Sequence, residues 1–134
     1  MDKMEEDGGR PVPLQFGQIK HIEEILATKD LNGQSVRVLG KVVEFDIPSN
    51  RVVLESPHGR THRLTVDTRL LEAMPLATHS LFQVIGELRR QEDQPGGYVL
   101  EARVARNVDG LDIGLYDEAL RLKRQFEAKA QQLG

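Results

Sequence analysis

Two histidines, His58 and His62, are four residues apart, a spacing that could bring two imidazoles to one metal ion. Pro57 and Gly59 flank the first of them and would break the helix that this spacing needs. No acidic residue stands where a third metal ligand would be expected. The pattern therefore favours an ordinary turn followed by a strand, and the sequence predicts no metal site.

Other residues with catalytic potential also lack suitable neighbours. The acidic pairs Glu5-Glu6 and Glu92-Asp93 fall in a predicted tail and a predicted loop, where solvated charge is commoner than carboxylates tuned for acid–base catalysis. No serine stands in a nucleophile-elbow motif. Neither Gly8-Gly9 nor Gly96-Gly97 precedes the Lys-Ser/Thr of a phosphate-binding loop. The sequence thus predicts a protein without enzymatic activity and without a cofactor.

Basic residues give a stronger signal, because many fall in or beside segments with strand-like alternation. Alternate side chains of a strand share one face of a sheet, so these residues could contact phosphates on the outside of a barrel. Solvated charge is nevertheless the commoner use of such side chains. The candidates for nucleic-acid contact are Arg37, Lys41, Arg103 and Arg106, and further basic residues in similar positions are Arg51, Arg60, Arg63, Arg89 and Arg90.

The composition limits what such a surface could bind alone. The 134 residues include 18 Lys+Arg and 21 Asp+Glu, and the formal charge of −3 argues against holding nucleic acid by net positive charge. Aromatic residues make up only 4% of the chain, so few rings remain for base stacking once a core is filled. The absence of cysteine excludes disulfides and thiolate zinc sites and favours a reducing, intracellular compartment. Any contact with nucleic acid is expected to be local or shared with a partner.

A strand-rich middle region must position these side chains. Alternation over residues 34–46, 51–56, 60–66, 80–90 and 97–108 predicts five strands. Gly40 inside the first strand would permit the sharp coiling that a small closed barrel requires. Asp67 can cap a short helix over residues 68–74, between the third and fourth strands, and Pro75 would end it. This order predicts a mainly β fold, a five-stranded Greek-key barrel of the OB type.

The chain is long enough for one domain and too short for two independent cores. Residues 1–13 combine alternating charge with paired glycines and two prolines, which is typical of a disordered tail. The expected single domain, residues 14–134, has an N-terminal segment (14–33), the barrel (34–110) and a C-terminal interaction helix (112–133). No apolar run is long enough to span a membrane, and charged residues rather than an apolar signal region follow Met1, so no membrane partner is expected.

The C-terminal helix carries acids near its start and bases toward its end, which favours the helix dipole. It also carries an apolar stripe, with two further apolar side chains beside it. We expect the first two turns of the stripe to pack on the barrel and the later turns to contact a partner, because an exposed apolar face is a liability on a monomer. The stripe consists of Leu115, Ala119, Leu122 and Phe126 and continues toward Leu133, and its neighbours are Tyr116 and Leu120.

Five segments occur in a characteristic order: Val36–Val42, Asp67–Glu72, Ser80–Leu88, Leu100–Gly110 and Leu115–Arg124. In this order the chain resembles the Ten subunit, the smallest subunit of the Ctc–Stn–Ten (CST) telomere-capping and replication complex. Residues 112–119 are also similar to the start of the last helix in the small subunit of replication protein A, which is the alternative. Members of both families are small OB folds that pair through this helix with a larger OB-fold subunit.

The resemblance implies a non-enzymatic nuclear subunit that binds and stabilises the Stn subunit and, through it, Ctc. The complex would hold single-stranded telomeric DNA and support replication restart and fill-in by DNA polymerase α–primase. The alternative implies a structural subunit of a general single-stranded DNA-binding trimer. Carried over by position, the first strand supplies Arg37 and Lys41 as DNA contacts, and the partner-binding residues are Leu115, Tyr116, Ala119, Leu122, Phe126 and Lys129.

Overall fold

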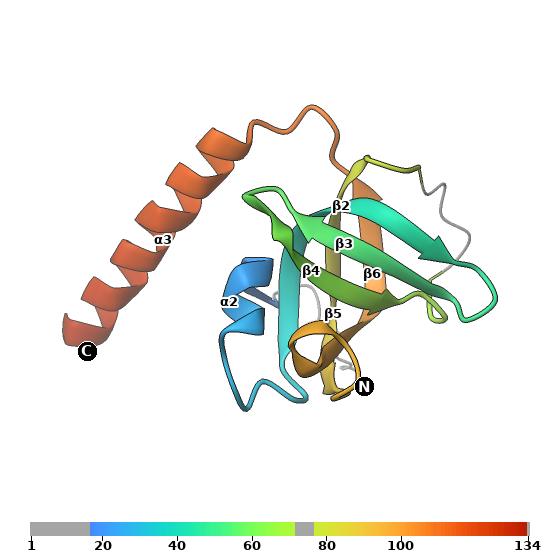
Figure 1. Cartoon of the computed structure of the whole chain (residues 1–134). Helices are drawn as coiled ribbons and strands as arrows, with labels where there is room; N and C mark the ends of the chain where they lie inside the picture. The colour runs from blue at the N-terminus through green and yellow to red at the C-terminus, as the bar shows by residue number, and fades with distance from the viewer. Residues whose placement is uncertain (1–16, 72–76, 134) are drawn as a thin grey trace, which may run out of the picture.

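Alternating apolar side chains build β2, Ser35–Asp46, around which the other elements are arranged. Val36, Val38 and Val42 are fully buried, because every second side chain of the strand points into the barrel. β2 is also the strand at which the sheet closes into a barrel. It pairs on one edge with residues 51–56 and on the other with residues 81–90, which are far from each other in sequence. The computed structural model, which describes residues 17–71 and 77–133, shows this barrel with one long helix beside it (Figure 1).

The other four barrel strands are β3 (Arg51–Ser56), β4 (Gly59–Asp67), β5 (Leu81–Arg90) and β6 (Tyr98–Asn107). The strands follow the order β2-β3-β4-β6-β5, and β5 pairs back onto β2 and closes the barrel. Only the β4–β6 pairing within this ring is parallel. This topology is the Greek-key OB barrel, so the expected fold class is confirmed. Each strand also begins and ends within one residue of the expected position.

Two glycines let barrel strands approach closely. A Cβ at Gly40 would lie 2.8 Å from the Cβ of Leu54, and a Cβ at Gly86 would overlap the backbone oxygen of Glu101. Gly86 also lies at a register shift between β5 and β6, where the strands bend. Glycine at these positions is therefore a condition for closing so small a barrel.

The segment before β2 covers one end of the barrel. It contains a short strand, β1 (Gln18–Ile19), which pairs in parallel with β2, and a short helix, α2 (Ile22–Leu26). Ile22 and Ile25 are fully buried in the core. The buried Tyr98 holds the end of this segment, because its hydroxyl donates to the Thr28 carbonyl at 3.1 Å and accepts from the Leu31 amide at 3.0 Å.

The connection between β4 and β5 begins as expected. The Asp67 carboxylate accepts a hydrogen bond from the Arg69 amide at 3.0 Å, as a cap would, and the Leu71 amide donates to the Thr68 carbonyl at 3.0 Å. Residues 72–76 lie outside the described residues, so only the first turn of the helix expected over 68–74 falls within them. The tail expected over residues 1–13 also lies outside them.

The long helix, α3 (Ile113–Leu133), follows β6 and lies on the α2 side of the barrel (Figure 1). Asp109 anchors the connection, because its carboxylate accepts a hydrogen bond from the Leu81 amide at 2.7 Å. Asp112 then caps the helix by accepting from the Leu115 amide at 3.0 Å. Neither helix of the described ranges is long and apolar enough to cross a membrane.

Candidate functional site

Helix α3 turns its more polar side toward the barrel. Tyr116, Leu120 and Arg124, spaced four residues apart, are its partly or fully buried residues on that side, and Leu120 is only 6% exposed. Leu115, by contrast, is 68% exposed. The expectation that the first turns of the apolar stripe pack on the barrel is therefore wrong. The barrel surface beneath α3 presents polar and charged groups, and the helix face that matches them is the one that docks.

Arg124 makes three hydrogen bonds to the segment before β2. Its two terminal nitrogens bind both carboxylate oxygens of Glu24 on α2 at 2.9 and 3.0 Å, and one of them also donates to the Ile19 carbonyl at 2.9 Å. The hydrogen bond with Glu24 raises the pKa of Arg124. Burial opposes ionisation of Glu24, but the hydrogen bonds from Arg124 and from the His21 amide leave the pKa of Glu24 below its usual value. This bidentate pair fixes the middle of α3 against α2.

Tyr116 is the second inward contact. Burial raises the pKa of Tyr116, while the nearby Gln83 side chain and the charge of Arg37 act in the opposite direction. Gln83 lies on β5, opposite Leu39 of β2, and is itself buried. Tyr116 was expected to contact a partner protein, but the structure turns it toward the chain's own barrel.

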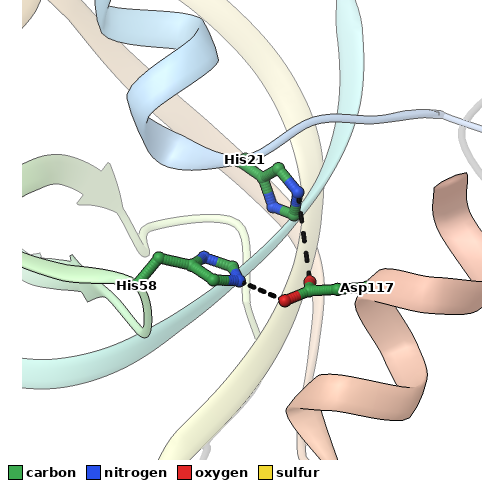
Figure 2. A group of neighbouring side chains, drawn as sticks. All are labelled: His21, His58 and Asp117. Carbon is green, nitrogen blue, oxygen red and sulfur yellow. Dashed lines mark hydrogen bonds and ion pairs between the residues drawn. The ribbon is translucent and has the colours of Figure 1, made fainter.

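A histidine cluster forms the third contact, near the start of α3 (Figure 2). His58 Nε2 lies 2.7 Å from one carboxylate oxygen of Asp117, and His21 Nε2 lies 4.0 Å from the other. The two imidazole rings meet edge to face with centroids 4.6 Å apart. The sequence offered no acidic residue as a third ligand beside His58, but the fold brings Asp117 there from 59 positions away in sequence. His62, the neighbour suggested by spacing, is not in this group.

The outward side of α3 carries the apolar stripe. Phe126 is 79% exposed and Leu122 is 50% exposed. Five of the six residues expected to bind a partner share this face of the helix, because their spacings of four, three, four and three repeat the helical period. They are Leu115, Ala119, Leu122, Phe126 and Lys129, all exposed.

The basic residues proposed for DNA contact separate into different surroundings. Arg37 and Arg106 come together in a hollow on the outer face of β2, β5 and β6, with Gln83, Ile85 and Val104. Lys41 is exposed, opposite Leu81. Arg103 faces the carboxylates of Glu101 and Glu87 at 3.3 and 3.8 Å, which offset its charge. The structure therefore brings two of the four together.

A second groove lies between the β2–β3 turn and the loop joining β5 to β6, the side on which OB folds commonly bind oligonucleotides. Phe45, which is 40% exposed, could stack on a base there. The groove contains two cations, Arg51 and Arg69. It also contains four acidic residues, whose negative charge opposes phosphate binding. The sequence did not point to this groove, because its walls come from segments distant in the chain. The acidic residues are Glu44, Asp46, Asp67 and Asp93.

Comparison with known proteins gives matches over most of the chain. Residues 14–130 match a family model described as "Telomere-capping, CST complex subunit". The chain is 33% identical to the human protein named CST complex subunit TEN1 over 105 residues, which cover 78% of this chain and 84% of that protein. It is 33% identical to the Arabidopsis thaliana protein of the same name over 94 residues, 70% of this chain and 71% of that protein. The crystal structure of the S. pombe Stn1–Ten1 complex contains a chain with the same fold, at a TM-score of 0.65 and 18% identity, covering 81% of this chain and 92% of that one.

Proposed function

This chain belongs to the family of telomere-capping CST complex subunits, and from that premise we propose that it binds and stabilises an Stn-like OB-fold subunit through the outward face of α3. The role is structural and not catalytic. Family membership favours this complex over the alternative suggested by the last helix, the small subunit of replication protein A.

The observation that carries the proposal is the exposed apolar stripe of α3. Leu115, Leu122 and Phe126 are large apolar side chains, each at least half exposed, on one face of a capped helix. Such a face fits a groove or a second helix on another protein. Burial of each of these side chains in an interface would contribute about 1.5–3 kcal/mol. The barrel does not need this face for its own fold, because α3 docks through its opposite side.

The proposed part of this subunit in DNA binding is shared with the complex. The net charge is −3, and several strand arginines are offset by nearby carboxylates: Arg63 by Glu44, and Arg89 by Glu87. The hollow formed with Arg37 and Arg106 is the most suitable described surface for a phosphate contact. We therefore expect weak binding of single-stranded DNA by the isolated chain and a measurable contribution once it is assembled.

The wider roles follow from the complex. The subunit would contact Ctc through Stn, act in the nucleus at telomeres, and support DNA polymerase α–primase fill-in and replication restart as part of the assembly. Affinity purification from nuclear extract tests this placement, because the stoichiometric partner is an Stn-like protein here and the middle subunit of replication protein A under the alternative.

The partner face is tested by Leu122→Asp combined with Phe126→Asp. This variant should lose the heterodimer with the Stn subunit of the same organism in a pull-down, while the isolated chain keeps its unfolding temperature. Ile47→Asp is a matched control, because Ile47 is 81% exposed on the β2–β3 turn, away from α3. A heterodimer of normal stability with the double variant would contradict the proposed interface.

The DNA contribution is tested by Arg37→Gln combined with Arg106→Gln in the assembled complex. Loss of two phosphate contacts should weaken single-strand binding and make the slope of log affinity against log salt less steep by about 1.4. Arg121→Gln serves as the control, since Arg121 pairs with Glu118 on the exposed surface of α3. Unchanged affinity and an unchanged salt slope would remove the hollow from the proposal.

A further inference from the structure

Three chemically suitable ligands meet where α3 crosses the barrel (Figure 2). His21 precedes α2, His58 lies in the turn between β3 and β4, and Asp117 projects from α3. One ligand atom from each lies within 4.8 Å of the others. Both imidazoles approach the same carboxylate, His58 Nε2 at 2.7 Å from one oxygen and His21 Nε2 at 4.0 Å from the other.

We propose that His21, His58 and Asp117 bind a divalent transition-metal ion of the zinc class. Two imidazole nitrogens and a carboxylate oxygen are a known donor set for zinc. Ligand atoms bound to zinc at 2.0–2.1 Å in a tetrahedron lie about 3.3 Å apart. The separations from the Asp117 oxygens, 2.7 Å for His58 Nε2 and 4.0 Å for His21 Nε2, lie on either side of that distance. Small side-chain rotations therefore bring the three donors onto one ion.

The carboxylate of Asp117 gives a second reason to place a metal ion at this cluster. Its Oδ1 atom is buried but receives no hydrogen bond, and it faces His21 at a distance too long for one. A buried unpaired carboxylate oxygen is costly, and a cation between Asp117 and His21 would satisfy it. The three side chains are 23–34% exposed, which leaves room for water as a fourth ligand.

A supporting set of hydrogen bonds orients His58. The buried Ser56 hydroxyl accepts from the His58 amide at 3.0 Å and donates to Glu23 Oε1 at 2.8 Å. The other Glu23 oxygen lies 3.5 Å from His58 Nδ1. His58 thus has Nδ1 toward a carboxylate and Nε2 toward Asp117, the arrangement that supports metal-bound histidines in proteins.

Metal binding at this site would fasten the start of α3 to the barrel, because the ligands belong to three separate elements. In the absence of metal, the short contact with Asp117 places a hydrogen on His58 Nε2. A neutral His58 that binds a metal through Nε2 carries its hydrogen on Nδ1 instead, where Glu23 faces it.

The test titrates the full chain, without any partner, with Zn²⁺ by calorimetry and with Co²⁺ by absorption. The expected result is one ion per chain, a tetrahedral Co²⁺ spectrum and no response to Mg²⁺. His58→Ala and Asp117→Asn should each weaken Zn²⁺ binding at least a hundredfold. Glu23→Gln, which removes only the orienting carboxylate, should weaken it about 10–100-fold.

His62→Ala is the matched control, because it removes a histidine of β4 outside the cluster. Unfolding temperatures of the metal-free variants show that each is folded. Absence of Zn²⁺ binding to the unmodified chain, or binding that survives both His58→Ala and Asp117→Asn, would overturn the proposal. An equal loss in His62→Ala would also overturn it. None of these outcomes depends on whether α3 binds an Stn subunit.

Discussion

The barrel and α3 are held by different forces. Closed backbone pairing and a continuous apolar core stabilise the barrel, whose largest buried side chains include Phe82 and Tyr98. Among the described side chains of α3, only Leu120 is buried, and the contacts of Arg124 with α2 and of Asp117 with the β3–β4 turn are polar. The barrel is thus determined by burial, whereas α3 is positioned by directed polar contacts that leave its apolar face available to another protein.

The largest expected difference between the two regions concerns two phenylalanines. Phe82→Ala should lower the free energy of unfolding by about 3–5 kcal/mol, because it leaves a cavity in the core. Phe126→Ala should change it by less than about 0.5 kcal/mol, because Phe126 is 79% exposed. Urea unfolding of the isolated chain measures both values. Similar losses for the two variants would show that α3 belongs to the cooperative core.

Two leucines sharpen the distinction within α3 itself. Leu120→Ala should destabilise the docking of α3 by about 2 kcal/mol, since Leu120 is buried against the barrel. Leu115→Ala should have little effect, because Leu115 is 68% exposed and the helix propensities are similar. Hydrogen exchange of the α3 amides reports docking separately from unfolding of the barrel. Equal loss of protection in both variants would contradict the assigned inward face.

A smaller effect is expected from the ion pair between Arg124 and Glu24. Both side chains are more than a third exposed, so solvent screening limits their coupling energy to about 0.5–1 kcal/mol. A double-mutant cycle with Arg124→Met and Glu24→Gln measures this energy. The more exposed pair of Lys123 and Glu127, four residues apart on α3, is the control and should give about 0.2–0.5 kcal/mol. A coupling no greater than that of the control would show that this pair contributes no more to docking than an ordinary surface ion pair.

The smallest expected effect is a pH dependence of the same contact. The pKa of Glu24 lies below its unfolded value of 4.5, so its stabilisation is present above about pH 4.5 and is lost as the pH falls through the folded pKa. The stability difference between the unmodified chain and Glu24→Gln should be constant from pH 6 to 8, amount to less than about 1 kcal/mol, and decline below pH 4.5. Urea unfolding at each pH tests this window. A difference that grows under acid conditions would reverse the assigned sign.

The strands could be predicted closely because alternation is a local property. A strand such as β3 requires only that successive side chains point to opposite faces, so its limits can be derived from neighbouring residues. The register shift beside Gly86 was not predicted, because it depends on the close approach of β6. The capping role of Asp67 was predicted, because the carboxylate and the amide that it accepts from are two residues apart.

The candidate site was predictable only in part. Apolar spacing identified the stripe of α3 but assigned its first turns to the barrel, because apolar residues were assumed to be the docking face. The inward side chains of α3 face Glu24, Gln83 and His58. None of these three residues is near α3 in sequence. The two-histidine cluster was missed for the same reason.

The amino-acid sequence by itself determined the barrel strands, the capped C-terminal helix and the apolar stripe, because each arises from interactions between residues close along the chain. Only the tertiary structure decided which face of α3 turns inward, which arginines meet carboxylates and which histidines meet Asp117. These pairings exist because barrel closure brings distant segments together, and the energy of a polar contact depends on the distance and geometry reached after closure.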